Sequence, residues 1–241
     1  MTMLPTNGPE NDPEHGPVAP RPGATLMLLR DADPGLEVLL LRRSDRARFV
    51  PGAHVFPGGA VDDADHDTAY RLHATTPADD LAHRVAAIRE SLEEAGILLA
   101  TTADGAALDR AHPVLTELPA LRHRIEAGHD HLAGVCRTHD LRLAIDDVVP
   151  VDRWVTPEES PVRFDARFYV APTPPGQTAV ADDREVGDAR WWNPSHALDA
   201  WRARRIQLIE PTVASLRLLA DHVAVDDALG HLRDRPVPVR S

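Results

Sequence analysis

One segment, residues 89–97, carries the side chains best suited to chemistry. It consists of Arg-Glu-Ser-Leu-Glu-Glu-Ala-Gly-Ile, with three glutamates and one arginine close together. On a helix that advances about 100° per residue, Glu93 lies at about −60° and Glu94 at about +40° from Glu90, so the three carboxylates share one face. The apolar residues of an amphipathic helix lie roughly opposite: Leu81, Val85, Ile88 and Leu92.

The acidic face of this helix has two interpretations. Glu90 and Glu94 are like charges at i, i+4, a spacing that costs about 0.2–0.5 kcal/mol in an isolated helix. Water can solvate such a face, or a divalent cation such as Mg²⁺, which takes oxygen ligands, can bind to it. The cluster alone leaves both interpretations open, and the sequence before it favours the metal site.

Length and composition indicate one globular domain. The chain has 241 residues, of which 43% are hydrophobic and 27% charged. A net charge of −12 argues against a nucleic-acid or anionic-membrane surface. The one cysteine, Cys136, excludes an internal disulfide and fits a reducing compartment. No apolar run approaches about 18 residues and no signal pattern opens the chain, so we expect a cytoplasmic protein with no membrane partner.

The N-terminal part of the chain predicts a disordered segment followed by a hairpin. Residues 1–22 are rich in proline and polar residues and should be disordered, with order beginning at Ala24. The apolar runs 24–29 and 36–41 predict two strands joined by the turn residues between them. The second run is almost wholly apolar, which is typical of a strand buried on both faces.

The residues between the hairpin and the acidic helix carry strong turn signals. Residues 42–59 should form a loop with a short extended piece at 54–56, and residues 60–80 a surface loop. Thr76 is the expected N-cap of the acidic helix, with Pro77 as its first residue. Gly96 should end that helix.

The remainder predicts a helical insertion followed by strands and terminal helices. The insertion, about 98–147, should be all-helical and interrupted at Pro113, Pro119 and Gly128. Strands are expected at 148–155, 164–171 and 186–192, helices from Asn193 to about Arg204 and within 211–232, and a flexible tail at 233–241. This order predicts one α/β domain over 23–232, in which a mixed sheet lies between helices.

Taken with the sequence before it, the acidic helix resembles the Nudix box, G-x5-E-x7-R-E-U-x-E-E-x-G-U with U apolar. Gly59 matches the first glycine, Asp65 falls at the first glutamate, and 89–97 match the second half except at Ser91, where an apolar residue is usual. Between Asp65 and Arg89 stand 23 residues (66–88) where the pattern has seven, so 16 extra residues interrupt the box. Either the inserted loop, 66–80, bulges out and leaves the geometry intact, or the match at Asp65 is accidental.

A second motif lies directly upstream. Residues 39–59 resemble L-L-T-x-R-(S/A)-x3-R-x3-G-x3-F-P-G-G, a motif of the coenzyme A diphosphatase branch, and only Leu41 departs from it. The run 49–59 and the interrupted box are similar in particular to the mammalian peroxisomal acyl-CoA diphosphatases. The resemblance covers about 24–220. It implies a Nudix α/β/α sandwich with a mixed sheet, here with a helical insertion and C-terminal helices.

The resemblance implies a metal-dependent diphosphatase. Mg²⁺ or Mn²⁺, held by Glu90, Glu93, Glu94 and the Gly59 carbonyl, would neutralise a diphosphate and activate water. Arg89 lies one helical turn before Glu93 and would hold that carboxylate by a charge-assisted hydrogen bond.

Two further groups of site residues follow from the resemblance. The general base would be a box glutamate or Glu185 in a loop before the last strand, with Asp182 and Asp183 as competitors; Glu185 could equally be an exposed loop residue. The motif positions Arg43, Ser44 and Arg48 would bind the phosphates of coenzyme A, because arginine is a bidentate phosphate donor. A solvated turn is the alternative for this stretch, and it suits Arg42 and Arg46 better.

The expected reaction is hydrolysis of coenzyme A or an acyl-CoA to 3′-phosphoadenosine 5′-phosphate and (acyl-)phosphopantetheine. The alternatives are a Nudix hydrolase of ADP-ribose, nucleotide sugars or other nucleoside diphosphates, and a non-catalytic nucleotide-binding module. The complete set of Arg89, Glu90, Glu93 and Glu94 argues against the module, which has no need of it. The apolar C-terminal helices and the resemblance suggest a homodimer, and no nucleic-acid partner is expected.

Overall fold

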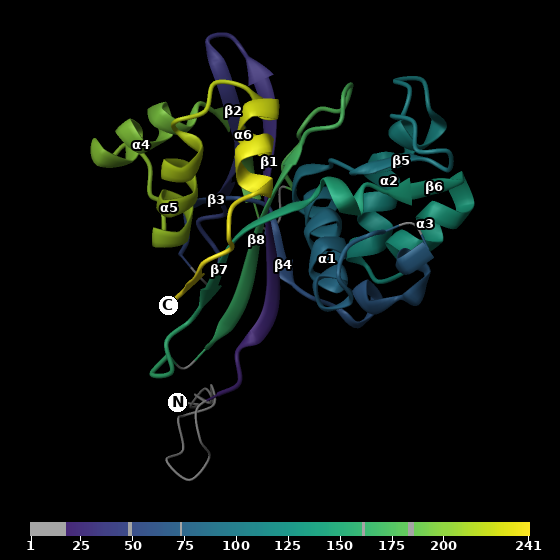
Figure 1. The fold of residues 1–241 in the computed structure, drawn as a ribbon, viewed down its shortest axis with the longest axis horizontal. Helices are drawn as coiled ribbons and strands as arrows, with labels where there is room; N and C mark the ends of the chain where they lie inside the picture. The colour runs from purple at the N-terminus through teal and green to yellow at the C-terminus, as the bar shows by residue number, and fades with distance from the viewer. Residues whose placement is uncertain (1–17, 48–49, 73, 161, 183–185) are drawn as a thin grey trace, which may run out of the picture.

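The structure is a computed structural model that describes residues 18–47, 50–72, 74–160, 162–182 and 186–241. These residues form a mixed sheet of eight strands, with helices packed on both of its faces (Figure 1). The order along the sheet is β10-β7-β8-β1-β2-β3, while β4 pairs with β1 and β9 pairs with β2. This arrangement confirms the predicted α/β class with a mixed sheet between helices.

The strands of the main sheet centre on β1, which runs parallel to β8 and antiparallel to β2 and β4. Their bounds are β1 (Arg21–Ala32), β2 (Gly35–Arg43), β3 (His54–Val55), β4 (Gly58–Ala60), β7 (Val149–Val155), β8 (Phe164–Pro172), β9 (Val186–Trp192) and β10 (Val239–Arg240). A separate antiparallel pair consists of β5 (Ala100–Thr102) and β6 (Leu141–Leu143).

The helices divide between the two faces of the sheet (Figure 1). One face carries α1 (Ala78–Ala95), α2 (Pro113–Glu126) and α3 (Leu132–His139), and the other carries α4 (Pro194–Arg202), α5 (Glu210–Leu219) and α6 (Val225–Arg233). The alternation along β1 explains the two cores, because Leu26 and Leu28 pack toward α1 while Met27 and Leu29 pack toward the C-terminal helices. None of the helices in the described segments is long and apolar enough to cross a membrane.

Several sequence predictions are confirmed where periodicity or turn chemistry is strong. The β1–β2 hairpin forms with Ala32 opposite Gly35, and the apolar run of β2 is fully buried. The last predicted strand coincides with β9. Asn193 caps α4, since its side-chain oxygen accepts a hydrogen bond from the His196 N–H at 3.2 Å.

Both ends of the predicted domain need correction. Strand β1 begins at Arg21, which pairs with Phe164 of β8, so order starts three residues before Ala24. Of the segment expected to be disordered, residues 1–17 lie outside the described residues. At the other end, Val239 and Arg240 pair with β7, so the expected tail at 233–241 contains a strand.

The two insertions also differ from the prediction. The insertion at 98–147 is not all-helical, because β5 and β6 close its base, and Pro119 lies inside α2. Residues 60–80 are not merely a surface loop, because they contain the end of β4 and two 3-10 helices, Asp63–His66 and Thr68–Leu72. The predicted cap of α1 is wrong: Pro77 occupies the N-cap, and the Thr76 hydroxyl donates to Asp146 at 2.9 Å.

Candidate active site

Helix α1 is fixed by the apolar stripe that the sequence indicates. Leu81, Val85, Ile88 and Leu92 are all buried in the core, and Glu90 and Glu94 lie against the glycines of β4. Gly96 ends the helix in the left-handed conformation at φ +68°, which favours glycine. Ser91 is fully buried where the family pattern has an apolar residue, and its hydroxyl donates to the Ile97 carbonyl at 3.0 Å. That bond satisfies the buried hydroxyl, so this departure from the pattern leaves the helix intact.

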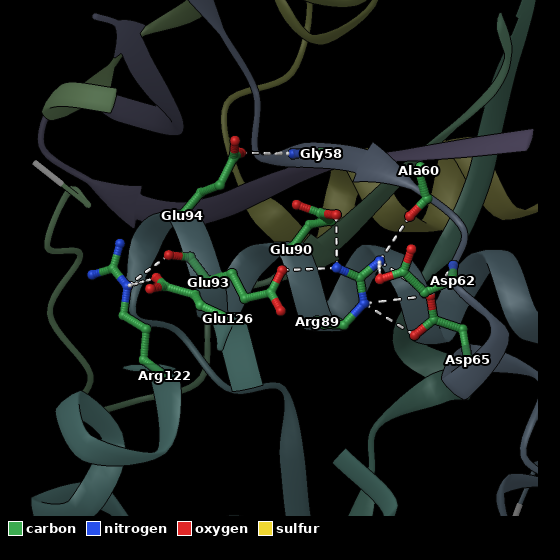
Figure 2. A network of polar contacts seen from close by, with 10 residues as sticks. All are labelled: Gly58, Ala60, Asp62, Asp65, Arg89, Glu90, Glu93, Glu94, Arg122 and Glu126. Carbon is green, nitrogen blue, oxygen red and sulfur yellow. Dashed lines mark hydrogen bonds and ion pairs between the residues drawn. The ribbon is translucent and has the colours of Figure 1, made fainter. Parts of the chain in front are cut away.

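Arg89 is the centre of the polar network in Figure 2. Its Nη1 donates to Glu90 at 2.8 Å and to Glu93 at 2.7 Å, and its Nη2 donates to the Ala60 carbonyl at 2.7 Å. Only 9% of the Arg89 side chain is exposed. The arginine therefore joins two of the three helix carboxylates to the end of β4, which agrees with the role expected for it toward Glu93.

Asp65 joins the same guanidinium in spite of the insertion. Its two carboxylate oxygens accept hydrogen bonds from Arg89 Nε and Nη2, each at 3.1 Å, and its side chain is 2% exposed. Oδ2 also accepts from the backbone N–H of Asp62 at 2.9 Å, which holds the short 3-10 helix in place. Asp65 and Arg89 therefore meet in space in spite of the 16 extra residues between the two halves of the box.

The two glycines of β4 differ in what a side chain would meet. A side chain at Gly58 would lie 2.6 Å from the Ala24 carbonyl oxygen, a backbone atom of β1, whereas a side chain at Gly59 would meet only the flexible end of the Glu90 side chain. Two hydrogen bonds fix the register of β1 and β4: the Leu26 N–H donates to the Pro57 carbonyl, and the Val61 N–H donates to the Pro22 carbonyl. In an antiparallel pair of strands, every second residue points its N–H and carbonyl toward the partner strand. Ala24 and Gly59, which lie midway between these two bonds, are therefore residues of this kind.

Gly58 faces the opposite way. Its N–H points away from β1 and donates to Glu94 at 2.9 Å, as Figure 2 shows. In an extended strand, the carbonyl of a residue lies on the same edge as its N–H. This register favours Gly58 over the predicted Gly59 as the residue whose carbonyl faces the glutamates.

The glutamates lie in an environment that disfavours their charge. Burial raises the pKa of Glu90 to about 7, although the Arg89 guanidinium opposes the shift and the Glu93 carboxylate adds to it. Burial likewise raises the pKa of Glu93, again against the effect of Arg89. Burial thus disfavours the charged form of both glutamates more than the Arg89 guanidinium favours it.

This donor set fits a divalent cation in chemistry. Hard cations take carboxylate and carbonyl oxygens, and here the carboxylates of Glu90 and Glu94 lie beside the backbone of the β4 glycines. In the described segments, however, no three acidic, histidine or cysteine side chains already converge on one point. Glu90 and Glu93 turn toward Arg89, while Glu94 turns toward Gly58 (Figure 2). Metal binding would therefore require these carboxylates to change rotamer.

Two of the three predicted phosphate-binding residues, Arg43 and Ser44, lie at the end of β2. Arg43 is opposite Val186 of β9, and its N–H donates to the Ala53 carbonyl at 2.9 Å. The Ser44 hydroxyl accepts from the Arg46 N–H at 3.3 Å. Arg42 pairs with Asp45, as the solvated-turn alternative suggests for it.

Two of the predicted site residues, Arg48 and Glu185, lie outside the described residues, as does Asp183. Asp182 is described and lies partly buried at the end of the segment before β9.

The sequence reasoning missed one contact to the acidic helix. Arg122 of α2 donates from Nε to the Glu93 carbonyl at 2.6 Å and forms an ion pair with Glu126 at 3.3 Å (Figure 2). Arg122 also donates from Nη1 to the Val180 carbonyl at 2.8 Å. The i, i+4 spacing of Arg122 and Glu126 is the one sequence signal of this arrangement, and it does not indicate which helix they contact.

Comparison with known proteins agrees with this geometry. The pattern of a family described as the NUDT19 Nudix domain matches residues 68–219, which is more than half of the chain and includes the glutamates of α1. Asp65 and the glycines of β4 precede the matched range. The prediction of a Nudix protein similar to coenzyme A diphosphatases is confirmed by this match and by the relatives below.

Two relatives are named acyl-coenzyme A diphosphatase NUDT19. The Xenopus laevis protein is 25% identical over 79% of this chain and 61% of its own length. The human protein is 28% identical over 80% of this chain and 63% of its own length. The match thus spans less than two thirds of each relative.

A solved structure extends the likeness to the fold. The crystal structure of a Nudix hydrolase from Alicyclobacillus acidocaldarius matches with a TM-score of 0.75 and 28% identity, over 90% of this chain and 99% of that one. The sequence match, the shared fold and the closed network around Arg89 agree with one another. The chain belongs to the Nudix hydrolase family, in the group described as the NUDT19 Nudix domain.

Proposed function

We propose that this chain hydrolyses the diphosphate linkage of coenzyme A or an acyl-CoA. The products would be 3′-phosphoadenosine 5′-phosphate and (acyl-)phosphopantetheine. The observation that carries the proposal is the contact of Asp65 and Arg89, which joins both halves of an interrupted Nudix box. The upstream motif over 39–59 and the names of the NUDT19 relatives support the coenzyme A substrate.

The proposed mechanism assigns a task to each residue of the network. Bound Mg²⁺ or Mn²⁺ would neutralise the diphosphate and lower the pKa of the attacking water. After a change of rotamer, Glu90, Glu93 and Glu94 would hold the ion, with a backbone carbonyl from Gly58 in preference to Gly59. Arg89 keeps Glu90 and Glu93 in position, and Asp65 fixes Arg89 in turn.

Further residues are assigned by the family resemblance. Glu185 or a box glutamate takes the proton of the attacking water, with Asp182 and Asp183 as competitors for that role. Arg43, Ser44 and Arg48 bind substrate phosphates. We also propose that the protein is cytoplasmic and forms a homodimer. Light scattering of the purified protein tests the homodimer.

A substrate panel tests the proposed reaction. The protein is incubated with coenzyme A, acetyl-CoA, longer acyl-CoAs, ADP-ribose and dinucleoside polyphosphates, each with Mg²⁺ or Mn²⁺. We expect turnover of the coenzyme A species and cleavage at the diphosphate. Turnover of ADP-ribose without any coenzyme A species would refute the substrate and favour the alternative Nudix hydrolase.

A variant tests the metal site. Glu93→Gln keeps the shape of the side chain and removes its charge, so turnover should fall about 10²-fold or more, the order seen when one charge-stabilising group of an active site is removed. Glu117→Gln, at an exposed position of α2, is the matched control and should retain full activity. Full activity of Glu93→Gln would contradict the metal-site assignment, and equal loss in the control would show that the assay reports folding.

A further inference from the structure

A cavity of about 550 Å³ lies beside the carboxyl end of α1. Its walls are α2 on one side and the segment 176–182 on the other, and Gly96 lies between them. A volume of this size is within the range of small-molecule sites, about 300–1,000 Å³. The cavity therefore has room for a substrate group that extends from the glutamates.

Hydrogen bonds fix both walls of the cavity to the catalytic helix. The Val180 N–H donates to the Ala95 carbonyl at 2.9 Å, and the Gln177 side chain both donates to and accepts from the Leu98 backbone, at 2.8 and 2.9 Å. On the other side, Arg122 reaches the Glu93 carbonyl. These bonds tie both walls to the carboxyl end of α1, the helix that carries the glutamates, although no glutamate of α1 lines the cavity itself.

The lining is mixed in character. Its apolar members are Leu115, Leu118, Pro119, Val180 and Ala181, and its polar members are Arg122, His123, Glu126, Gln177, Thr178 and Asp182. Arg122 Nη2 is buried in the cavity wall and makes no hydrogen bond to the described residues, so it is an unsatisfied donor there. The cavity thus suits a flexible chain of methyl and methylene groups that also carries amide carbonyls.

We propose that this cavity binds the pantetheine arm of the substrate, with its apolar groups against Val180 and Pro119 and an amide carbonyl toward Arg122. The inference rests on the proposed function, since the pantetheine phosphate is one of the two phosphates cleaved apart at the glutamates. The helical insertion that supplies α2 then contributes directly to substrate recognition. The nucleotide half of the substrate lies outside this cavity.

Two neutral substitutions test opposite walls of the cavity. Val180 is 59% exposed and Pro119 is also exposed, so Val180→Gln and Pro119→Gln should fold, and the latter removes a proline from a helix interior. Val223→Gln, at a valine that is 74% exposed between α5 and α6, is the matched control. None of the three changes net charge, so long-range repulsion of an anionic ligand is constant.

The measurement is the KM for coenzyme A, together with the inhibition constants of the two products. Each cavity variant should raise the KM for coenzyme A and the inhibition constant of 4′-phosphopantetheine about three- to tenfold, from partial loss of one apolar contact. The inhibition constant of 3′-phosphoadenosine 5′-phosphate and the turnover number should stay within about twofold of wild type, as should every value for Val223→Gln.

The possible failures are distinguishable. If the wild type hydrolyses coenzyme A and both cavity variants keep its KM, the cavity assignment is wrong and the proposed function stands. If the variants weaken inhibition by 3′-phosphoadenosine 5′-phosphate instead, the cavity holds the nucleotide half and the assignment is again overturned. If the wild type hydrolyses no coenzyme A species, both the proposed function and this inference fall.

Discussion

Replacing Asp65 by asparagine tests whether the interrupted box is closed by the contact to Arg89. The substitution keeps the shape of the side chain and one carbonyl oxygen, which can still accept from the Asp62 N–H. It removes the charge and places an NH₂ group against a guanidinium that now donates to both carboxylate oxygens at 3.1 Å. Arg89 keeps Glu90, Glu93 and the Ala60 carbonyl as partners, so its charge is not left unpaired.

The expected loss is therefore that of a hydrogen bond to a charged group, about 2 kcal/mol. For a chain of this size, that loss lowers the melting temperature by about 4–8 °C. Activity should fall about 10- to 100-fold, because displacement of Arg89 also displaces Glu90 and Glu93. Thermal denaturation and initial rates with the best substrate of the panel measure both effects.

Asp63→Asn is the matched control, since Asp63 belongs to the same 3-10 helix and is exposed. It should change stability by no more than about 0.5 kcal/mol and leave the rate unchanged. If Asp65→Asn behaves like this control, the contact does not close the box. If Asp65→Asn lowers stability alone, Asp65 supports the fold without positioning the glutamates, and the argument for its role in the site is refuted.

Two further predictions concern β4 and the start of α1. Gly58→Ala would place a methyl group 2.6 Å from the Ala24 carbonyl oxygen, so β4 must shift relative to β1; we expect a rate loss of about 10²-fold, measured in the same assay, and wild-type activity would contradict the steric argument. Burial acts to raise the pKa of Asp80, but hydrogen bonds from Tyr169, Arg84 and Arg167 outweigh it and lower the pKa. The stabilisation from Asp80 is then full above its unfolded pKa of about 3.9 and is lost as pH falls through the folded value. Urea unfolding of Asp80→Asn should show a deficit at pH 7 that disappears in strong acid, and a deficit independent of pH would refute this.

The fold was predictable where the chain repeats a physical signal. The apolar stripe of α1, the hairpin of β1 and β2 and the cap at Asn193 each depend on residues close in sequence, and each is confirmed. Short elements carry no such signal. The two residues of β10 are too few for a periodicity, and their pairing with β7 depends on where the C-terminal helices end.

The glycines of β4 show a different limit. Gly58 and Gly59 follow a proline and are strong turn signals, yet both pair with β1. Gly58 lies close to the backbone of Ala24 and Thr25 and Gly59 lies against the Glu90 side chain, and the sequence alone places neither contact. Arg122 was missed for a related reason: it comes from an insertion whose packing on α1 depends on the tertiary fold.

The interruption of the box is tolerable because its two halves meet through side chains. Lengthening a flexible connection from seven to 23 residues costs only about 1 kcal/mol of additional closure entropy. Tyr70 of the insertion is buried in the core beside α1, and Asp146 accepts hydrogen bonds from the N–H of Thr75 and the hydroxyl of Thr76. Burial of one aromatic side chain, at about 1.5–3 kcal/mol, offsets that entropy. Spacing within the box can therefore vary while the contact of Asp65 with Arg89 is kept, because the contact and not the spacing positions the glutamates.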